Sequence, residues 1–342
     1  MLQHSELRRL RRIVVLPLAL AAALAAADAA AQLAPSQLAL VVNDDEPNSV
    51  AIAEEYRRQR NVPAANLIHV HIPGSPRKLD AASFAHLKAD IDARLPAGVQ
   101  AVLFVWTAPY AVECNGITAA YTLGFDAAQC DKPCGPGRRS PVFGAPPGAL
   151  PGGTPRLSML LPTTSLELAK ALIQRGTAAG FSVPKAGAYY LTTSETARNS
   201  RAAFFPRAGV LAPRKLTIHN LKQDVLENAG DVMIYQTGKA KVDKLDTLKF
   251  LPGALADHLT SFGGDLLAEN QMSSLRWLEA GATASYGTVA EPCNHWQKFP
   301  HPEVLLRSYL RGASAIEAYW RSVAWPAQGV FIGEPLAAPY PR

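Results

Sequence analysis

Apolar runs and amphipathic segments alternate along the first third of the chain. The consecutive apolar residues predict three buried strands, at 38–44, 66–73 and 100–107. The first interval predicts a turn and a helix, capped by Asn48 or Ser49 and ended before Pro63. The second interval predicts an amphipathic helix, because apolar residues recur at spacings of three, four and four: Phe84, Leu87, Ile91 and Leu95. This alternation is typical of right-handed βαβ crossovers in a parallel sheet.

The alternation returns further along the chain. A helix is predicted at 164–176, where Thr164 and Glu167 have the spacing of a capping box, and a second α/β half follows it. Further strands are predicted at 187–193, 215–220, 231–238, 282–289 and 329–335. Further helices are predicted at 221–230, at 273–281, from Pro302, and at 314–325 with a second capping box at its start. The pattern therefore predicts an α/β fold with a parallel sheet, built in two halves.

The segment 108–156 interrupts this rhythm. It contains three of the four cysteines and a stretch rich in proline and glycine. We expect it to form a long excursion from the sheet, held in place by disulfides.

The first residues resemble an export signal. Four arginines precede an apolar run at 13–27, and small residues follow it. This arrangement predicts a secretory signal cleaved after Ala31, and hence a protein of the periplasm or the extracellular space. A retained membrane anchor is the alternative, but the run is short for the roughly 20 residues that a spanning helix needs. The paired arginines leave both the general and the twin-arginine export routes open.

The predicted organisation is therefore a signal peptide (1–31), an N-terminal α/β half (32–180) that contains the excursion, and a C-terminal α/β half (181–342). Cleavage removes four arginines, Glu6 and Asp28, which lowers the formal charge from +6 to +4. A charge this small and evenly spread argues against nucleic acid as a partner. No later apolar run approaches membrane-spanning length, so we expect no membrane partner after cleavage.

All four cysteines lie in the part that would be exported: Cys114, Cys130, Cys134 and Cys293. In an oxidising compartment an even number of cysteines indicates disulfides, and three pairings are possible. Cys293 is also a candidate nucleophile, because His295 could serve as its base. The disulfide is the favoured interpretation of Cys293. The histidines and carboxylates around it match no strong zinc signature, so neither a metal nor a cofactor is predicted.

A second candidate pair for acid–base chemistry is Asp257 and His258, with a serine hydroxyl close by at Ser261. The spacing fits no known triad motif. Ligands of open parallel sheets bind beyond the carboxyl ends of the strands, and polar residues concentrate at the predicted ends. The candidate ligand-binding residues are Asn43, Asp44, Asp45, Glu113, Ser261 and Glu291.

Five segments resemble a family of uncharacterised exported bacterial proteins: 39–70, 108–114, 251–264, 282–303 and 329–339. More distantly, the layout is similar to the gingipain-type, caspase-like cysteine peptidases. That likeness implies a three-layer caspase-like architecture in two halves. It also implies a His–Cys dyad at the ends of neighbouring strands and a closing Gly-Asp-Pro turn, which here is Gly333-Glu334-Pro335.

The dyad of those peptidases does not carry over to this sequence. The strand that should end in histidine offers Gln236 and Gly238, and the strand that should deliver cysteine offers Asp257 and His258. We therefore expect a non-peptidase that binds an envelope or extracellular component. The alternative is a hydrolase that uses either His258 with Asp257 or Cys293 with His295.

Overall fold

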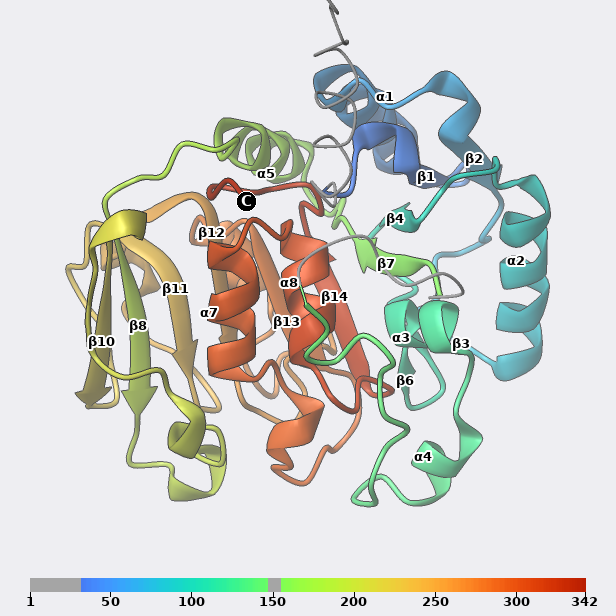
Figure 1. The fold of residues 1–342 in the computed structure, drawn as a ribbon. Helices are drawn as coiled ribbons and strands as arrows, with labels where there is room; N and C mark the ends of the chain where they lie inside the picture. Colours follow the sequence, from blue (N-terminus) through green and yellow to red (C-terminus); the bar gives the residue numbers. More distant parts are fainter. Residues whose placement is uncertain (1–31, 147–154) are drawn as a thin grey trace, which may run out of the picture. The chain divides into compact units, whose positions relative to one another are not determined.

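Eleven strands form one mixed sheet in the computed structural model, which describes residues 32–146 and 155–342 (Figure 1). The predicted signal peptide lies outside the described residues. In order across the sheet, the strands are β2 (Leu67–Val70), β1 (Leu38–Asn43), β4 (Ala101–Val105), β7 (Leu157–Leu160), β14 (Gly329–Gly333), β13 (Ala284–Thr288), β12 (Phe250–His258), β11 (Val232–Thr237), β8 (Ala186–Thr192), β10 (Leu216–Lys222) and β9 (Gly209–Leu211).

Two runs of neighbouring strands in the sheet are parallel, and the edge strand β9 is antiparallel to β10. The strands from β2 to β14 are parallel to one another, and so are the strands from β13 to β10. The two runs meet where β14 pairs antiparallel with β13. Segments that follow strands of the two runs contact each other, since the hydroxyl of Tyr110, after β4, donates to the carboxylate of Asp265, after β12.

Helices cover both faces of this sheet. On one face, α5 (Leu166–Ala178) contacts both α1 (Pro47–Arg60) and α6 (Leu275–Glu279). The other face carries α2 (Ala81–Arg94), α3 (Ile117–Leu123), α7 (Pro302–Leu310) and α8 (Ala315–Ser322) (Figure 1). The α/β class and the three-layer arrangement around a mostly parallel sheet are confirmed, as the caspase-like architecture requires.

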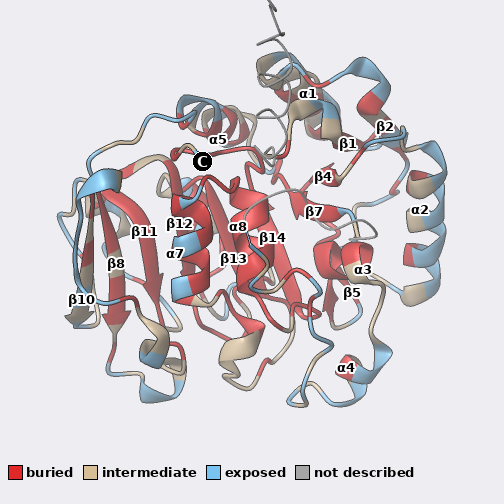
Figure 2. Ribbon diagram, viewed as in Figure 1, coloured by how far each residue is buried: buried red, intermediate tan, exposed pale blue. Residues whose placement is uncertain are grey.

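The central strands are buried along their whole length, as Figure 2 shows. Strands covered by helices on both faces have no side exposed to water, so their sequences are continuously apolar rather than alternating. This explains why the apolar runs predicted β1 and β4. The short strand β7 was not predicted, because it follows the glycine- and proline-rich stretch without a helix before it.

Several local predictions need correction. The predicted helix at 221–230 is wrong, because β10 continues to Lys222 in register with β8 and is followed by a turn. Helix α1 is capped at Glu46, with Pro47 in its first position, and not at Asn48 or Ser49. Helix α5 begins after Ser165, whose hydroxyl accepts a hydrogen bond from Leu168 N at 3.3 Å, so Thr164 is not its cap.

Two disulfides hold the excursion in place, as predicted. It contains β5 (Ala111–Val112), β6 (Asn115–Gly116) and the short helix α4 (Ala127–Asp131). Strand β5 pairs with β6 on one side and with β3 (Lys78–Leu79) on the other. One disulfide, Cys114–Cys130, closes a loop within the excursion. The other, Cys134–Cys293, joins the excursion to the loop that follows β13. Cys293 is thus paired with one of the three earlier cysteines.

None of the helices in the described residues is both long and apolar enough to span a membrane.

Candidate functional site

The carboxyl end of β1 carries three of the predicted ligand-binding residues, and each of them has a partner within the protein. Asn43 is fully buried, and its Oδ1 accepts hydrogen bonds from Asp45 N at 3.2 Å and Ile72 N at 3.0 Å. Asp44 lies 2.6 Å from His69 Nδ1, and Asp45 lies 3.2 Å from His71 Nδ1. The buried amide therefore fixes the chain after β1 to the chain after β2, and the two carboxylates form surface pairs.

Glu113 lies elsewhere, in the turn between β5 and β6. Its side chain is exposed, its φ is 49°, and its backbone N donates to Leu79 O at 3.0 Å. No other predicted site residue lies in this turn.

Asp257 and His258 are fully buried at the end of β12. As consecutive residues of a strand, they point to opposite faces of the sheet. Asp257 forms an ion pair with Arg201 and accepts a hydrogen bond from Gln236 Nε2 at 2.9 Å. The structure therefore does not bring Asp257 and His258 together as an acid–base pair.

Both ring nitrogens of His258 have partners. The indole Nε1 of Trp277 donates to Nδ1 at 2.8 Å, so Nε2 carries the proton and donates to Met272 O at 3.0 Å. Burial lowers the pKa of His258 to about 3, which keeps the ring neutral. This histidine holds neighbouring elements in place and has no free nitrogen to accept a proton from a substrate.

Cys293 has no thiol in this oxidised form, because its sulfur is bonded to Cys134. A thiolate nucleophile is therefore not present at Cys293, and the described chain has no free cysteine. Glu291 Oε1 accepts a hydrogen bond from Cys293 N at 2.7 Å. His295 Nε2 donates to Cys134 O at 2.9 Å, and Lys298 Nζ donates to Pro133 O. These residues hold the excursion against the loop after β13.

Ser261 follows β12 and is 9% exposed. Its backbone carbonyl accepts a hydrogen bond from Thr288 Oγ1 at 2.9 Å, which connects the chain after β12 to the end of β13. The structure thus groups the loop residues Glu291, Cys293 and His295. It separates them from Asn43, Asp44 and Asp45, which lie at the end of β1, because β4, β7 and β14 lie between β1 and β13 in the sheet.

The site that the sequence did not predict is a cavity of about 440 Å³ beside the chain segments that leave β11 and β12. It is lined by Ala240 and Lys241, by residues 266–273, and by Leu275, Arg276 and Glu279 of α6. We call it the β11–β12 pocket. Its volume is within the range of small-molecule sites in proteins, and its position follows the rule that ligands bind beyond the carboxyl ends of parallel strands.

The walls of this pocket are fastened to the sheet. Met272 N donates to Ala240 O at 3.0 Å, which joins the two segments that line it. Gln271 Oε1 accepts from Thr260 Oγ1 at 2.7 Å and from Phe262 N at 2.9 Å. His258 supports the same wall through Met272 O. The buried histidine that sequence patterns suggested as a catalyst is therefore part of the support beneath the pocket.

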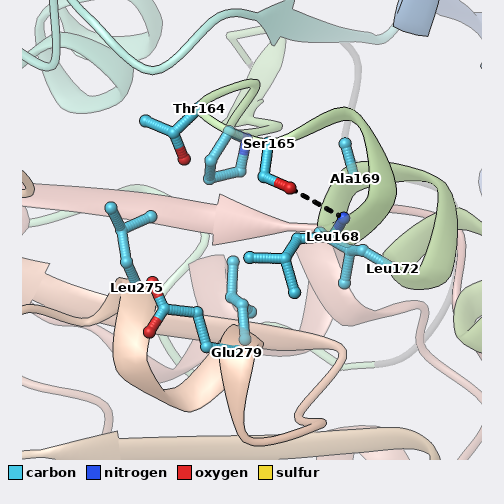
Figure 3. Close-up of a pocket in the computed structure, with 9 residues that line it drawn as sticks. Thr164, Ser165, Leu168, Ala169, Leu172, Leu275 and Glu279 are labelled. Carbon is cyan, nitrogen blue, oxygen red and sulfur yellow. Dashed lines mark hydrogen bonds between the residues drawn. The ribbon is translucent and has the colours of Figure 1, made fainter.

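An aliphatic slot adjoins the pocket between α5 and α6. Figure 3 shows its leucines from the two helices, with the Ser165 hydroxyl bonded to Leu168 N at its rim. The slot has a volume of about 20 Å³ and shares Leu275 and Glu279 with the β11–β12 pocket. Its aliphatic lining comes from Leu168, Leu172, Leu275 and Leu278.

Sequence patterns gave little sign of this site. The segment 239–249 is polar enough to be taken for a solvated loop, and residues 266–273 match no motif. The one available signal was topological, since both segments follow strands. Among residues 32–146 and 155–342, no cluster of three or more histidine, cysteine or acidic side chains could hold a metal ion.

No protein-family model matches the chain. No curated protein matches it either. A solved structure described as that of a protease is similar at a TM-score of 0.45 and 9% sequence identity, over 90% of this chain and 79% of its own. A likeness of this kind transfers no activity.

Proposed function

We propose that this protein is an exported, ligand-binding protein with a caspase-like architecture, and not a cysteine peptidase. Its ligand, a component of the envelope or the extracellular space, binds in the β11–β12 pocket. The observation that carries the proposal is the pocket itself, a cavity of about 440 Å³ beside the ends of two parallel strands.

The state of the cysteines supports a role other than thiol catalysis. A cysteine peptidase needs a thiolate beside a base, and all four cysteines are in disulfides. Two disulfides also favour an oxidising compartment, in agreement with the export signal expected from the sequence. His258, which donates a hydrogen bond to Met272 O in the pocket wall, is neutral and has a partner at both ring nitrogens.

The proposal is tested by filling the pocket. A small-molecule library would be screened against the mature protein by ligand-detected NMR, with Ala268→Trp as the pocket-filling variant. Ala82→Trp, on the exposed side of α2, is the matched control. We expect compounds that bind the wild type and Ala82→Trp but not Ala268→Trp. Binding that is indifferent to Ala268→Trp, or no binding at all, would overturn the proposal.

The hydrolase alternative is tested in parallel. The oxidised protein would be treated with iodoacetamide and analysed by mass spectrometry, then incubated with a fluorogenic peptide library. We expect no carbamidomethylation before reductant is added and no peptide cleavage. Cleavage that is lost in Cys293→Ser would show that the protein is a peptidase instead.

A further inference from the structure

We propose that the ligand of the β11–β12 pocket is a small aliphatic zwitterion. Its anionic group pairs with Lys241, its cationic group pairs with Glu269, and a branched aliphatic tip enters the slot between α5 and α6. This inference rests on the proposed function, because it names the chemistry of the ligand that the pocket binds.

The charges of the pocket support a ligand with both signs of charge. The lining contains two cationic and two anionic side chains, so its formal charge is zero. Arg276 and Glu279 pair with each other at 2.5 Å, within one turn of α6. Lys241 and Glu269 are exposed to solvent and have no hydrogen-bond or ion-pair partner among the described residues. The charges left for a ligand are therefore one ammonium and one carboxylate.

These two unpaired groups come from different walls. Lys241 belongs to the segment that leaves β11, and Glu269 belongs to the segment that leaves β12. A ligand with a single charge would satisfy only one wall and leave the opposite charge beside it without a partner. Charge complementarity favours a dipolar ligand, because like charges placed together are disfavoured in binding sites.

The slot adds the aliphatic requirement. Leu168 is 41% exposed, although it is one of the large apolar side chains of α5 and lies against the slot. The slot volume of about 20 Å³ accommodates roughly one water-sized or methyl-sized group. Its leucine lining offers a water molecule too few polar partners, so a methyl group is the better occupant.

The pocket and the slot are adjacent. Leu275 and Glu279 line both, so one molecule can contact the charged walls and the leucines together. The larger volume exceeds what one free amino acid fills, which leaves room for a ligand of about the size of two linked residues.

The probe for the test is L-leucyl-L-leucine, which carries both charges and two branched side chains. Its dissociation constant would be measured by isothermal titration calorimetry with the mature, oxidised protein. N-acetylation of the probe removes its cation, and amidation removes its anion. Glycylglycine keeps both charges and lacks the aliphatic tips. We expect each of these three changes to weaken binding by about tenfold or more.

Two variants locate the charges on the protein. The Lys241→Gln protein should bind leucyl-leucine and its amide with equal affinity. The Glu269→Gln protein should bind leucyl-leucine and its acetylated form with equal affinity. Lys249→Gln and Glu227→Gln change exposed charges outside the pocket, and they should leave all affinities unchanged. Leu168→Ala should weaken leucyl-leucine and leave glycylglycine unchanged.

The possible failures are distinguishable. If library compounds bind the pocket but the four probes bind equally or not at all, the zwitterion inference is wrong and the proposed function stands. If leucyl-leucine binds Ala268→Trp as tightly as wild type, its site is not this pocket and the inference is also wrong. If nothing binds in the pocket, both proposals fail.

Discussion

The chain after β1 and the chain after β11 and β12 differ in how their polar groups are used. After β1, the amide of Asn43 is buried in backbone hydrogen bonds and both aspartates are paired with histidines. After β11 and β12, a cavity opens between the segments, and its lining residues Lys241 and Glu269 have no partner in the part of the chain that the structure describes. A high density of polar residues at a strand end therefore does not mark a binding site. Groups left without partners beside a cavity are the better indicator.

The largest expected effect concerns the buried ion pair at the end of β12. Arg201 binds Asp257, Thr237 O at 2.8 Å and Pro300 O at 3.1 Å, all in the core. Arg201→Met would leave a buried carboxylate without its cation, which typically costs about 3–5 kcal/mol. Chemical denaturation should show this loss in the free energy of unfolding. Arg207→Met, on the exposed segment that follows, is the control and should change stability little.

The free energy of unfolding should depend on pH because of His258. Its pKa is about 3 in the folded protein, against a usual value near 6.5, so the unfolded chain binds more protons between these pH values. Folding should therefore weaken by about 1.4 kcal/mol per pH unit as pH falls from about 6.5 towards 3. The slope is measured from urea denaturation at several pH values.

The control for this slope is His258→Gln, which cannot take up the proton. Its overall stability should be lower, because two buried hydrogen bonds change, but its stability should depend less on pH over the same interval. An unchanged slope would contradict the assignment of this dependence to His258. His86 is exposed on α2, so His86→Gln is the matched control. Its stability should depend on pH with the same slope as that of the wild type.

Asn43→Ala tests the role of the polar groups in the chain after β1. It leaves the backbone N atoms of Asp45 and Ile72 without their acceptor, which should cost about 1–3 kcal/mol. Because Asn43 supports the chain after β1 only, the affinity of the β11–β12 pocket for its ligands should stay the same. Loss of ligand binding in a folded Asn43→Ala protein would show that the two regions are coupled.

The smallest effect is expected for Asp44→Asn. Its pairing with His69 lies at the surface, where the two side chains are 31% and 46% exposed. Exposed ion pairs contribute less than about 1 kcal/mol, so thermal denaturation should change by a few degrees at most. Asp44→Asn should not alter ligand binding. A clear loss of binding would show that the ligand binds at Asp44, as the sequence predicted, and not in the β11–β12 pocket.

Much of the architecture was predictable from the chain alone. Strands buried on both faces are continuously apolar, so the runs that became β1, β4, β11, β13 and β14 were recognisable without any partner. The periodic leucines and phenylalanines of α2 were equally clear. The helix prediction at 221–230 was wrong, although the composition of this segment favours a helix. The start of the segment pairs with β8 as part of β10, and such a tertiary contact cannot be read from sequence periodicity.

The candidate site was much less predictable. The prediction of a disulfide at Cys293 needed only the number of cysteines and the compartment, but its partner, Cys134, is 159 residues away. Asp257 and His258 are polar residues at a strand end, which is also the pattern of a catalytic pair. Their burial and their partners, Arg201 and Trp277, come from distant parts of the chain.

The α/β class, the buried strands, the pairing of Cys293 in a disulfide and the absence of the peptidase dyad from its expected positions could all be predicted from the order of residues. These depend on local periodicity and residue identity. The antiparallel pairing of β14 with β13 could be known only from the folded chain. The tertiary structure also decided which charges stay unpaired beside a cavity, because pairing depends on distances between segments that the order of residues does not contain.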